Sequence, residues 1–518
     1  MARALIFEKN CVCGVVAART ADDARRQLRR ALRYTDTVEL RFDWFANAEE
    51  IQRLLALLKK TRIPRRAAMI ATCRRREAGG RFLGAVAAQL SLLRSAMNAG
   101  CNWIDLEIES VGAIPAFALD LYTSSAKRIV SYHDFRGTPN PSRLARVMRR
   151  MKQIAEGAGC DAIKIATQCD SLSDSLRLFA LARQDTNVIA VPMGDVATPA
   201  RILAPRLGSA LSYAPVEQAT APGQVSLGEL HELYRGGNVT SRTRVYGVIG
   251  NPIAHSFSPV LHNAGFRARK IDALYLPFRV LDLTDFLQAV EPLGIAGFSI
   301  TLPYKEKILA HLDHMDPLAR SIGAANTVVV KANGKLFGYN TDSVGVLRAF
   351  EGRLALSGSR VLILGAGGVA RAAAFALARA GASVAICSRR QERARQLARA
   401  VQGESVSRAA LGKRFFDVII NATPVGMHPR EDESPIAPQE LNCRLAFDTV
   451  YRPRKTRFLR LAAKRGIDTV SGLEMFLAQG IAQWEIWIGQ AAPVVAMRRA
   501  VLEAVRRAEA KKMSKKKQ

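Results

Sequence analysis

One lysine and one histidine stand where predicted strands would place reactive side chains. Lys164 lies between isoleucines in Asp161-Ala-Ile-Lys-Ile-Ala166, and His133 follows the apolar run Arg128-Ile-Val-Ser-Tyr132. Burial is unfavourable for an ammonium group, so it lowers the pKa of a lysine and favours the neutral amine that forms a Schiff base with a ketone. A nearby histidine is a suitable general base. Each residue alone also fits a structural role, a lysine snorkelling at a strand end or a satisfied histidine.

The second reactive pattern is a glycine-rich turn. Val361-Leu-Ile-Leu364 is typical of a buried parallel strand, residues 365–370 read Gly-Ala-Gly-Gly-Val-Ala, and a helix is expected from Arg371. Glycines let the backbone approach a phosphate, and a helix N-terminus presents free N–H groups at a positive dipole end. The pattern predicts a pyrophosphate site, with an ordinary tight turn as the alternative.

The elements that hold Lys164 and His133 form a repeating pattern. Eight short runs with strand character alternate with helix-like or loop segments, which predicts a (β/α)8 TIM barrel. In such barrels the catalytic groups sit at the carboxyl ends of the strands. The predicted strands are residues 11–16, 37–42, 67–72, 103–108, 128–132, 161–166, 187–191 and 210–214.

Polar motifs near the ends of these runs resemble those of type I 3-dehydroquinate dehydratases. They include Glu39-Leu-Arg41, Thr72-Cys-Arg74, Ser131-Tyr-His133 and Thr220-Ala-Pro-Gly-Gln224. The resemblance implies a cofactor-free barrel in which Lys164 forms an iminium with the substrate ketone. It also implies that His133 removes the α-proton and protonates the departing hydroxyl. The substrate-binding side chains that it implies are Glu39, Arg41, Arg74, Arg201, Thr220 and Gln224.

The loop before Gly79-Gly80 departs from that family. The family places a glutamate directly before the glycine pair to orient the histidine, whereas this chain has Ala78 there and Glu77 one residue earlier. Two interpretations stay open. Either the loop bulges so that Glu77 reaches His133, or the histidine lacks this partner and the dehydratase is slower.

A second set of motifs follows a linker-like Gly-Gly-Asn-Val-Thr-Ser stretch between Tyr234 and Arg244. Ser256 and Ser258 precede a helix that begins with proline, where serines either cap the helix or hold a carboxylate. With further pieces at residues 297–305, 323–328 and 338–342, they make residues 245–500 resemble shikimate dehydrogenases.

That resemblance implies roles for individual residues. Ser256 and Ser258 bind the substrate carboxylate, and Lys305 with Asp342 manages the proton at the reacting C–O group, where an ammonium stabilises the developing charge. The remaining substrate-binding residues that it implies are Thr301, Asn326, Tyr451 and Gln479.

The residues after the predicted strand Ser383-Val-Ala-Ile-Cys387 favour NADP(H) as cofactor. A NAD site places an acidic residue there, but this chain has arginines, which suit a 2′-phosphate. A basic helix start is the alternative. The predicted cofactor-binding residues are Gly365, Ala366, Gly367, Gly368, Val369, Ala370, Ser388, Arg389, Arg390, Arg393, Thr423 and Met475.

Composition narrows the class of protein. The 518 residues are 49% hydrophobic and 23% charged, and they contain neither a membrane-length apolar run nor a secretory signal, so a cytoplasmic protein is expected. No CxxC pair suggests a metal site. The net charge of +31 invites a nucleic-acid interpretation, but no aromatic residues are interleaved with the arginines to stack on bases, so solvated helix faces are favoured. The sequence leaves the oligomeric state open.

The predicted architecture is α/β throughout. We expect a barrel at 1–235, a substrate-binding domain at 244–345 completed by 472–505, a Rossmann NADP domain at 346–471 and a basic tail at 506–518, in which the charge cluster 511–518 is expected to be disordered. The expected activities are dehydration of 3-dehydroquinate to 3-dehydroshikimate and its reduction to shikimate with NADPH. The alternatives are an active dehydrogenase with an impaired barrel, a quinate/shikimate dehydrogenase that uses NAD, and a nucleic-acid-binding or scaffolding protein.

Overall fold

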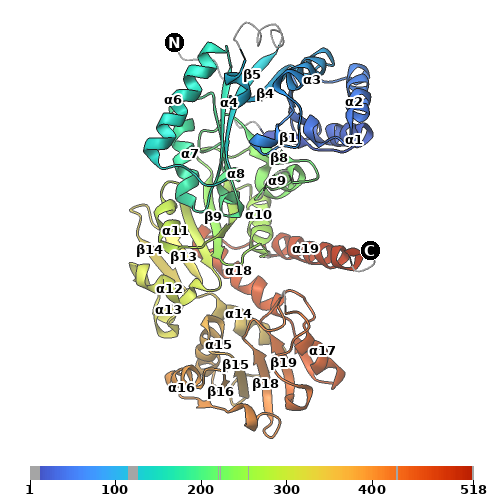
Figure 1. Cartoon of the computed structure of the whole chain (residues 1–518). Helices are drawn as coiled ribbons and strands as arrows, with labels where there is room; N and C mark the ends of the chain where they lie inside the picture. Colours follow the sequence, from blue (N-terminus) through green and yellow to red (C-terminus); the bar gives the residue numbers. More distant parts are fainter. Residues whose placement is uncertain are drawn as a thin grey trace. The chain divides into compact units, whose positions relative to one another are not determined.

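A computed structural model describes residues 12–114, 126–219, 221, 223–254, 256–427 and 430–515 (Figure 1). The chain divides into two compact units. The first comprises residues up to Thr243 together with 278–294, and the second comprises 244–277 together with the residues from Ile295 onward. Within the described residues, no helix has both the length and the apolar character that a membrane crossing requires.

The first unit is built on an eight-stranded parallel sheet with the order β7-β6-β5-β4-β3-β2-β1-β8. The last strand pairs with the first, and the Ala210 N–H donates to the Val188 carbonyl at the remaining seam (3.0 Å), so the barrel is nearly closed. The predicted barrel is confirmed. Its strands are β1 (Val12–Val16), β2 (Thr37–Arg41), β3 (Ala68–Thr72), β4 (Trp103–Glu107), β5 (Lys127–Asp134), β6 (Ala162–Gln168), β7 (Val188–Met193) and β8 (Ser212–Pro215).

Helices alternate with these strands, and several begin at a polar cap. The side chains of Thr20, Asn47, Asn140, Ser171 and Ser226 each accept a backbone N–H from the first turn of the helix that follows. The helices are α1 (Ala21–Ala31), α2 (Ala48–Lys60), α3 (Val86–Asn98), α4 (Ile108–Gly112), α6 (Pro141–Gly157), α7 (Leu172–Gln184), α8 (Thr198–Ile202) and α9 (Leu227–Tyr234).

The second unit contains a mixed six-stranded sheet with the order β10-β9-β11-β13-β14-β12, in which β13 runs antiparallel to both neighbours. The strands are β9 (Arg244–Gly250), β10 (Ala273–Arg279), β11 (Ile295–Ile300), β12 (His314–Met315), β13 (Thr327–Val330) and β14 (Leu336–Tyr339). The helices that accompany them along the chain are α10 (Ser258–Ala268), α12 (Tyr304–Lys307), α13 (Pro317–Ile322) and α14 (Asp342–Phe350), while α11 (Leu283–Val290) belongs to the first unit.

The C-terminal helices α18 (Gly472–Ile488) and α19 (Val494–Lys515) pack into the core of this part. Trp484 of α18 is fully buried 5.1 Å from the Phe266 ring, and a Cβ on Gly265 would lie 2.6 Å from Trp484. The expectation of a disordered tail from Lys511 is wrong as far as Lys515, because α19 continues to that residue. The alanine, arginine, glutamate and lysine residues of this segment favour helix.

A second six-stranded sheet, with the order β17-β16-β15-β18-β19-β20, is parallel throughout. Its chain order reverses between β15 and β18, and open parallel sheets bind ligands at the carboxyl ends of strands at such a point. The elements are β15 (Arg360–Leu364), α15 (Gly368–Arg379), β16 (Ser383–Cys387), α16 (Gln391–Ala400), β17 (Glu404–Ser405), β18 (Phe416–Asn421), β19 (Cys443–Asp448), α17 (Arg457–Lys464) and β20 (Asp468–Val470).

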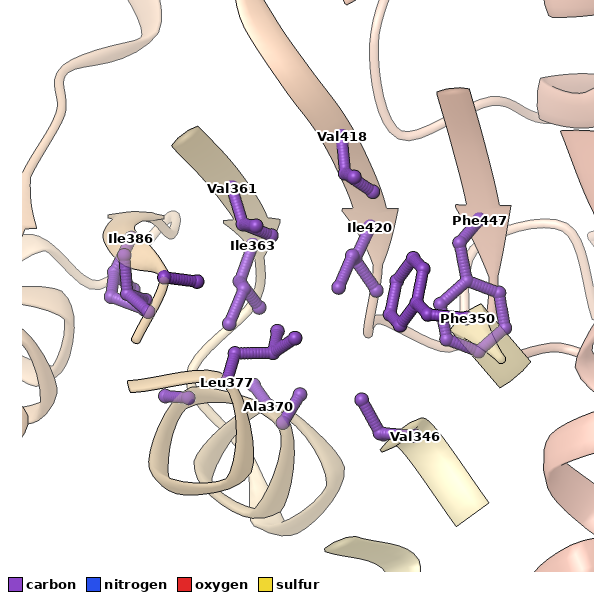
Figure 2. Close-up of a cluster of buried hydrophobic side chains, with 14 of the residues drawn as sticks. Val346, Phe350, Val361, Ile363, Ala370, Leu377, Ile386, Val418, Ile420 and Phe447 are labelled. Atoms are coloured by element: carbon purple, nitrogen blue, oxygen red, sulfur yellow. The ribbon is translucent and has the colours of Figure 1, made fainter. Parts of the chain in front are cut away.

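One face of this sheet is covered by α14 and α15. Figure 2 shows Val361, Ile363, Val418 and Ile420 pointing from the strands toward these helices. Phe350 of α14 meets Phe447 of β19 edge to face, with ring centroids 5.5 Å apart. This apolar packing fixes α15, and with it the glycine turn that leads into the helix.

Candidate active sites

The inner surface of the barrel changes from apolar to polar along β4, β5 and β6. Trp103, Ile129 and Ala162 belong to a buried apolar cluster, and Asp105, Ser131 and Lys164 follow two residues later on the same strands. Alternate residues of a strand share one face, so all of these side chains point inward. An apolar layer therefore supports a polar one, as in enzymes of this architecture.

Lys164 faces carboxylates in this polar layer. Its Nζ donates to Asp105 Oδ2 at 2.9 Å, lies 3.7 Å from Glu39 Oε1, and sits 4.2 Å from the centroid of the Tyr213 ring. Lys164 is buried in mid-strand, as expected, and the isoleucines beside it in sequence lie on the opposite face of β6.

Asp105 is a buried anion that the sequence analysis did not assign to the site. It accepts hydrogen bonds from Lys164, from Arg74 (2.9 Å) and from Ser131 (2.7 Å). Burial raises the pKa of Asp105, but the charges of Arg74 and Lys164 and these hydrogen bonds more than offset it, so the pKa lies below its usual range. The signal in the sequence was the place of Asp105 two residues after Trp103 in the strand Trp-Ile-Asp-Leu-Glu, because alternate residues of a strand share one face.

Arg74 and Arg41 are held by carboxylates. Arg74 is 4% exposed and pairs with Asp105 and, at 3.8 Å, with Glu107. Burial lowers the pKa of Arg74, but these carboxylates outweigh it and raise the pKa above the usual value. Arg41 donates to both carboxylate oxygens of Asp43, at 2.9 and 2.8 Å.

Arg201 differs from these arginines because no ion pair joins it to a carboxylate within the described part of the chain. It is 7% exposed and donates only to the backbone carbonyls of Pro192 (3.3 Å) and Tyr213 (3.5 Å). Burial lowers the pKa of Arg201 to about 10. A buried guanidinium without a counter-ion is suited to a carboxylate ligand.

His133 stands at the end of β5 with its buried Nδ1 lacking a hydrogen-bond partner among the described residues. Its ring stacks on Phe135 with centroids 6.0 Å apart and an interplanar angle of 14°. Burial, followed by the charges of Arg74 and Lys164, lowers the pKa of His133 well below its usual value. The imidazole is therefore neutral at physiological pH, as a general base requires.

Glu77 does not reach this histidine. Its side chain is 72% exposed and pairs with Arg75 at 2.5 Å. The turn that follows is fixed, because Gly79 has φ +79° and a Cβ there would lie 2.2 Å from Phe135. This geometry agrees with the second interpretation, in which His133 lacks a carboxylate partner on this loop.

Two predicted barrel residues, Thr220 and Gln224, lie in or beside a short stretch that the structure describes only in part. Thr220 falls outside the described residues. Gln224 lies nearby in the chain, where its Oε1 accepts the Ala221 N–H at 3.0 Å. Glu39 lies inside the barrel, 3% exposed, and accepts the Thr72 hydroxyl at 2.8 Å.

In the second unit, elements that are distant in the sequence bring Lys305, Asp342 and predicted substrate-binding residues together. Lys305 of α12 donates to Asp342 Oδ2 at 2.5 Å, and Asn326, just before β13, donates to Asp342 Oδ1 at 2.9 Å. Asn326 also lies 3.4 Å from Gln479 Oε1 of α18. The predicted Thr301 directly follows β11. An ammonium held by a buried carboxylate is arranged to deliver a proton to an oxygen.

The predicted carboxylate-binding serines lie at the start of α10. Ser258 is its first residue, and the Ser258 N–H donates to Ser256 Oγ at 3.2 Å, so Ser256 also serves the helix entrance. The Tyr451 hydroxyl hydrogen-bonds to Ser256, and its ring stacks on Phe476 with centroids 4.5 Å apart. Burial raises the pKa of Tyr451.

The glycine turn between β15 and α15 has the geometry of an anion site. Gly365 has φ +118°, and a Cβ there would lie 2.9 Å from the Ala422 carbonyl. A Cβ on Gly367, the N-cap of α15, would meet nothing within 4 Å, whereas one on Gly368 would lie 3.1 Å from Lys305. The open helix N-terminus therefore adjoins the Lys305–Asp342 pair.

Several predicted cofactor-binding side chains pack elsewhere than in this opening. Ala370 and Met475 belong to the same buried apolar cluster, in which Figure 2 labels Ala370. Only the backbone of Ala370 is therefore available to a cofactor. Ala366 and Val369 are partly buried and pack against the same core. Thr423 lies close to the turn, since a Cβ on Gly365 would be 3.2 Å from its Cγ2.

Three exposed arginines follow β16, at the edge of this opening. Arg389, Arg390 and Arg393 make no ion pair within the described residues, whereas Arg395 on the same helix lies 3.8 Å from Glu392. Ser388 is partly buried beside them. The residues present thus fit a dinucleotide that carries an additional phosphate.

Family sequence models match both units of the chain. Type I 3-dehydroquinase matches residues 12–239, and the shikimate dehydrogenase substrate binding domain matches 248–328. Shikimate / quinate 5-dehydrogenase matches 348–429, and the shikimate 5'-dehydrogenase C-terminal domain matches 472–502.

Two relatives in sequence give the same division. The chloroplastic bifunctional 3-dehydroquinate dehydratase/shikimate dehydrogenase of Arabidopsis thaliana is 34% identical over 94% of this chain and 84% of its own length. The shikimate dehydrogenase (NADP(+)) of Desulforamulus reducens is 41% identical over 50% of this chain and 95% of its own. A crystal structure of shikimate 5-dehydrogenase from Thermus thermophilus with NADP(H) and shikimate shares 36% identity and a TM-score of 0.47, covering 51% of this chain and 99% of that one.

Proposed function

The chain belongs to the family of bifunctional 3-dehydroquinate dehydratases/shikimate dehydrogenases, and on that premise we propose how its two sites divide the chemistry. The barrel dehydrates 3-dehydroquinate to 3-dehydroshikimate, and the second unit reduces 3-dehydroshikimate to shikimate with NADPH. The observation that carries the first step is the buried Lys164 beside Asp105, and a buried guanidinium at Arg201 supports it.

In the barrel, the Lys164 nitrogen adds to the substrate ketone and water leaves, so an ammonium and a ketone become an iminium and water. The positive charge is conserved in this step, and Asp105 faces one cation before and after it. The iminium acidifies the neighbouring C–H bond, whose proton passes to neutral His133, and the resulting enamine expels the hydroxyl as water with that proton. Hydrolysis then returns Lys164 and the product ketone.

The substrate is held by charged groups around Lys164. Arg201 pairs with the substrate carboxylate, since it has no protein carboxylate to pair with in the described residues. Glu39, Arg41, Arg74, Thr220 and Gln224 are proposed to bind the hydroxyls and close over the substrate. The barrel needs no cofactor for this chemistry.

In the second unit, NADPH supplies the hydride when it is bound at the glycine turn. Lys305 protonates the oxygen on which negative charge develops, and Asp342 holds the ammonium in place. Ser256, Ser258 and Tyr451 bind the carboxylate side of the substrate. Its hydroxyls are proposed to contact Thr301, Asn326, Asp342 and Gln479.

We propose the following domain limits and compartment. The barrel comprises residues 1–235, the substrate-binding domain 244–345 with 472–505, and the NADP domain 346–471. The element ranges and the family matches support these limits. The described cysteines are free thiols, as in proteins of a reducing compartment, which supports the cytoplasm.

Trapping of the iminium tests the proposed dehydratase. Borohydride added during turnover of 3-dehydroquinate reduces an iminium to a stable amine, and mass spectrometry should place the adduct on the peptide that contains Lys164. Lys164→Ala should form no adduct, while Lys152→Ala, at a lysine that pairs with Asp185 outside the site, should form it normally. An adduct on another residue, or turnover by Lys164→Ala, would contradict the assignment.

A further inference from the structure

A buried carboxylate lies where the two parallel strands β18 and β19 end. Asp448 is 0% exposed and sits opposite Asn421 in the ladder. Its Oδ1 accepts from Asn421 Nδ2 and from the Val450 N–H, both at 2.9 Å, and its Oδ2 accepts from the Thr456 hydroxyl at 2.5 Å. No lysine or arginine pairs with it in the described residues, so hydrogen bonds alone satisfy this anion.

On one side this network reaches the cofactor turn. Asn421 Oδ1 accepts from the backbone N–H of Thr423 at 3.0 Å and from its hydroxyl at 2.7 Å. Thr423 in turn lies against Gly365, the first glycine of the turn. The position of the Thr423 loop therefore depends on the orientation of the Asn421 amide.

On the other side the network reaches the substrate serines. Val450, whose N–H donates to Asp448, directly precedes Tyr451. The Tyr451 hydroxyl bonds to Ser256, and its ring packs on Phe476. The residues that meet at Asp448 thus lead to both halves of the dehydrogenase site.

The partners of Asp448 require it to be an acceptor. A backbone N–H only donates, and the Asn421 amide presents its NH2 group to Asp448 because its oxygen is occupied by Thr423. Thr456 Oγ accepts the Leu459 N–H at 3.3 Å as the cap of α17, which leaves its hydrogen to point at Asp448. A proton on the carboxyl group would displace this last hydrogen bond.

We propose that Asp448 is a positioning residue of the dehydrogenase, which as a carboxylate fixes Thr423 at the cofactor turn and Tyr451 at the substrate serines relative to each other. This inference rests on the dehydrogenase function proposed above. It adds a group that touches neither substrate nor cofactor, and it makes binding of both ligands depend on one buried charge.

The pKa of Asp448 lies in a pH range in which the kinetics of the dehydrogenase can be measured. Burial raises the pKa of Asp448 to about 7, against the hydrogen bonds of Thr456, Val450 and Asn421, which lower it. The groups that face the carboxylate from β18 and from the segment before α17 do not titrate. Binding of NADPH and substrate should therefore weaken as pH falls through this range.

The effect on folding stability has the opposite sign. The pKa of Asp448 is raised on folding from 3.8 to about 7, so its contribution is fully present below 3.8 and is lost as pH rises through about 7. The Asp448 carboxylate, which orders the segments of Thr423 and Tyr451, therefore lowers folding stability while it improves the binding of NADPH and substrate. A merely structural role would change stability without changing the Michaelis constants.

Asp448→Asn in the full chain tests the inference. The KM values for NADPH and for 3-dehydroshikimate should both rise about tenfold, as for loss of a hydrogen bond to a charged group, with a smaller change in kcat. They should no longer vary between about pH 6 and 8. Asp417→Asn is the matched control, because Asp417 near the start of β18 accepts the Arg360 N–H (2.7 Å) far along the strand from the site.

The outcomes separate the possible failures. A cooperative melting transition of the second unit, as in the parent, shows that this unit folds in Asp448→Asn. Unchanged KM values and pH dependence in Asp448→Asn would overturn the inference. Parent protein without NADPH-dependent activity would instead overturn the proposed function. If Asp448→Asn does not fold, Thr456→Val provides the test, because it removes one hydrogen-bond donor to Asp448 and should raise both KM values. Thr456→Ser keeps the hydroxyl and should restore both KM values. Equal KM values for the two Thr456 variants would also overturn the inference.

Discussion

Lys164 and Asp105 face each other inside the barrel, with Nζ 2.9 Å from Oδ2, although 59 residues separate them in the chain. Asp105 also holds Arg74, so one carboxylate pairs with two buried cations. Because formation of the proposed iminium conserves the charge, Asp105 faces a cation before and after that step. The consequences for mutants follow from that arrangement.

Asp105→Asn should lower the dehydratase kcat by at least about 100-fold, because two buried cations would lose their nearest counter-ion. The dehydrogenase activity of the same chain should stay unchanged, and a cooperative melting transition of the barrel shows that the substituted unit is folded. Asp36→Asn, at an exposed pair with Arg66, provides the control. Steady-state rates of both reactions check the prediction, and a near-normal dehydratase in Asp105→Asn would contradict it.

Glu77→Gln should leave the dehydratase rate within about twofold of the parent, since exposed ion pairs contribute little. Were Glu77 to reach His133 during turnover, the rate would instead fall about tenfold or more, as when a general base loses its orienting partner. Initial rates at saturating 3-dehydroquinate distinguish these results.

Ala78→Glu should change the pH profile of the dehydratase. In the parent, burial and neighbouring cations lower the pKa of His133, so the base stays neutral and active well below pH 6.5. A carboxylate placed beside the imidazole raises that pKa, and the acidic limb of kcat/KM should move to higher pH. An unmoved limb would mean that residue 78 does not approach His133.

Arg201→Met should weaken substrate binding without destabilising the barrel. Its guanidinium is buried without a counter-ion, so its removal relieves a desolvation penalty and should keep or raise the melting temperature. Loss of a charge-assisted pair with the substrate carboxylate should raise KM by about 10- to 100-fold. A lower melting temperature with unchanged KM would assign Arg201 a structural role.

Replacement of Arg389, Arg390 and Arg393 by glutamine should reduce the preference for NADPH over NADH by about 100-fold, since each arginine offers donors to the 2′-phosphate. Arg395→Gln, on the same helix but 3.8 Å from Glu392, should leave the preference unchanged. The ratio of kcat/KM for the two cofactors measures it, and an unaltered ratio in the triple variant would place phosphate recognition elsewhere.

The sequence predicted strands better than it predicted polar networks. Ser383–Cys387 has the predicted bounds, because an apolar run bounded by turn residues marks a buried strand. Helix α15 begins at Gly368, three residues before the expected Arg371, because the glycine turn itself forms the first turn of the helix. The antiparallel β13 was not foreseen, since strand direction depends on distant pairing.

The roles of individual side chains depended on contacts that local sequence does not contain. Asp105 meets Lys164 across 59 residues, and Asp448 meets Asn421 across 27. The direction of Glu77 is set by Arg75 and by the fixed glycine turn against Phe135. Motifs therefore located the sites, while the contacts of Asp105 and Asp448 emerged only from the fold.

The most direct test of the whole account is conversion of 3-dehydroquinate to shikimate by one purified chain supplied with NADPH. The parent protein should form shikimate with one NADPH oxidised per product, and Lys164→Ala should form none while still reducing added 3-dehydroshikimate. A parent chain that reduces 3-dehydroshikimate but leaves 3-dehydroquinate untouched would contradict the account, because its barrel would then be inactive.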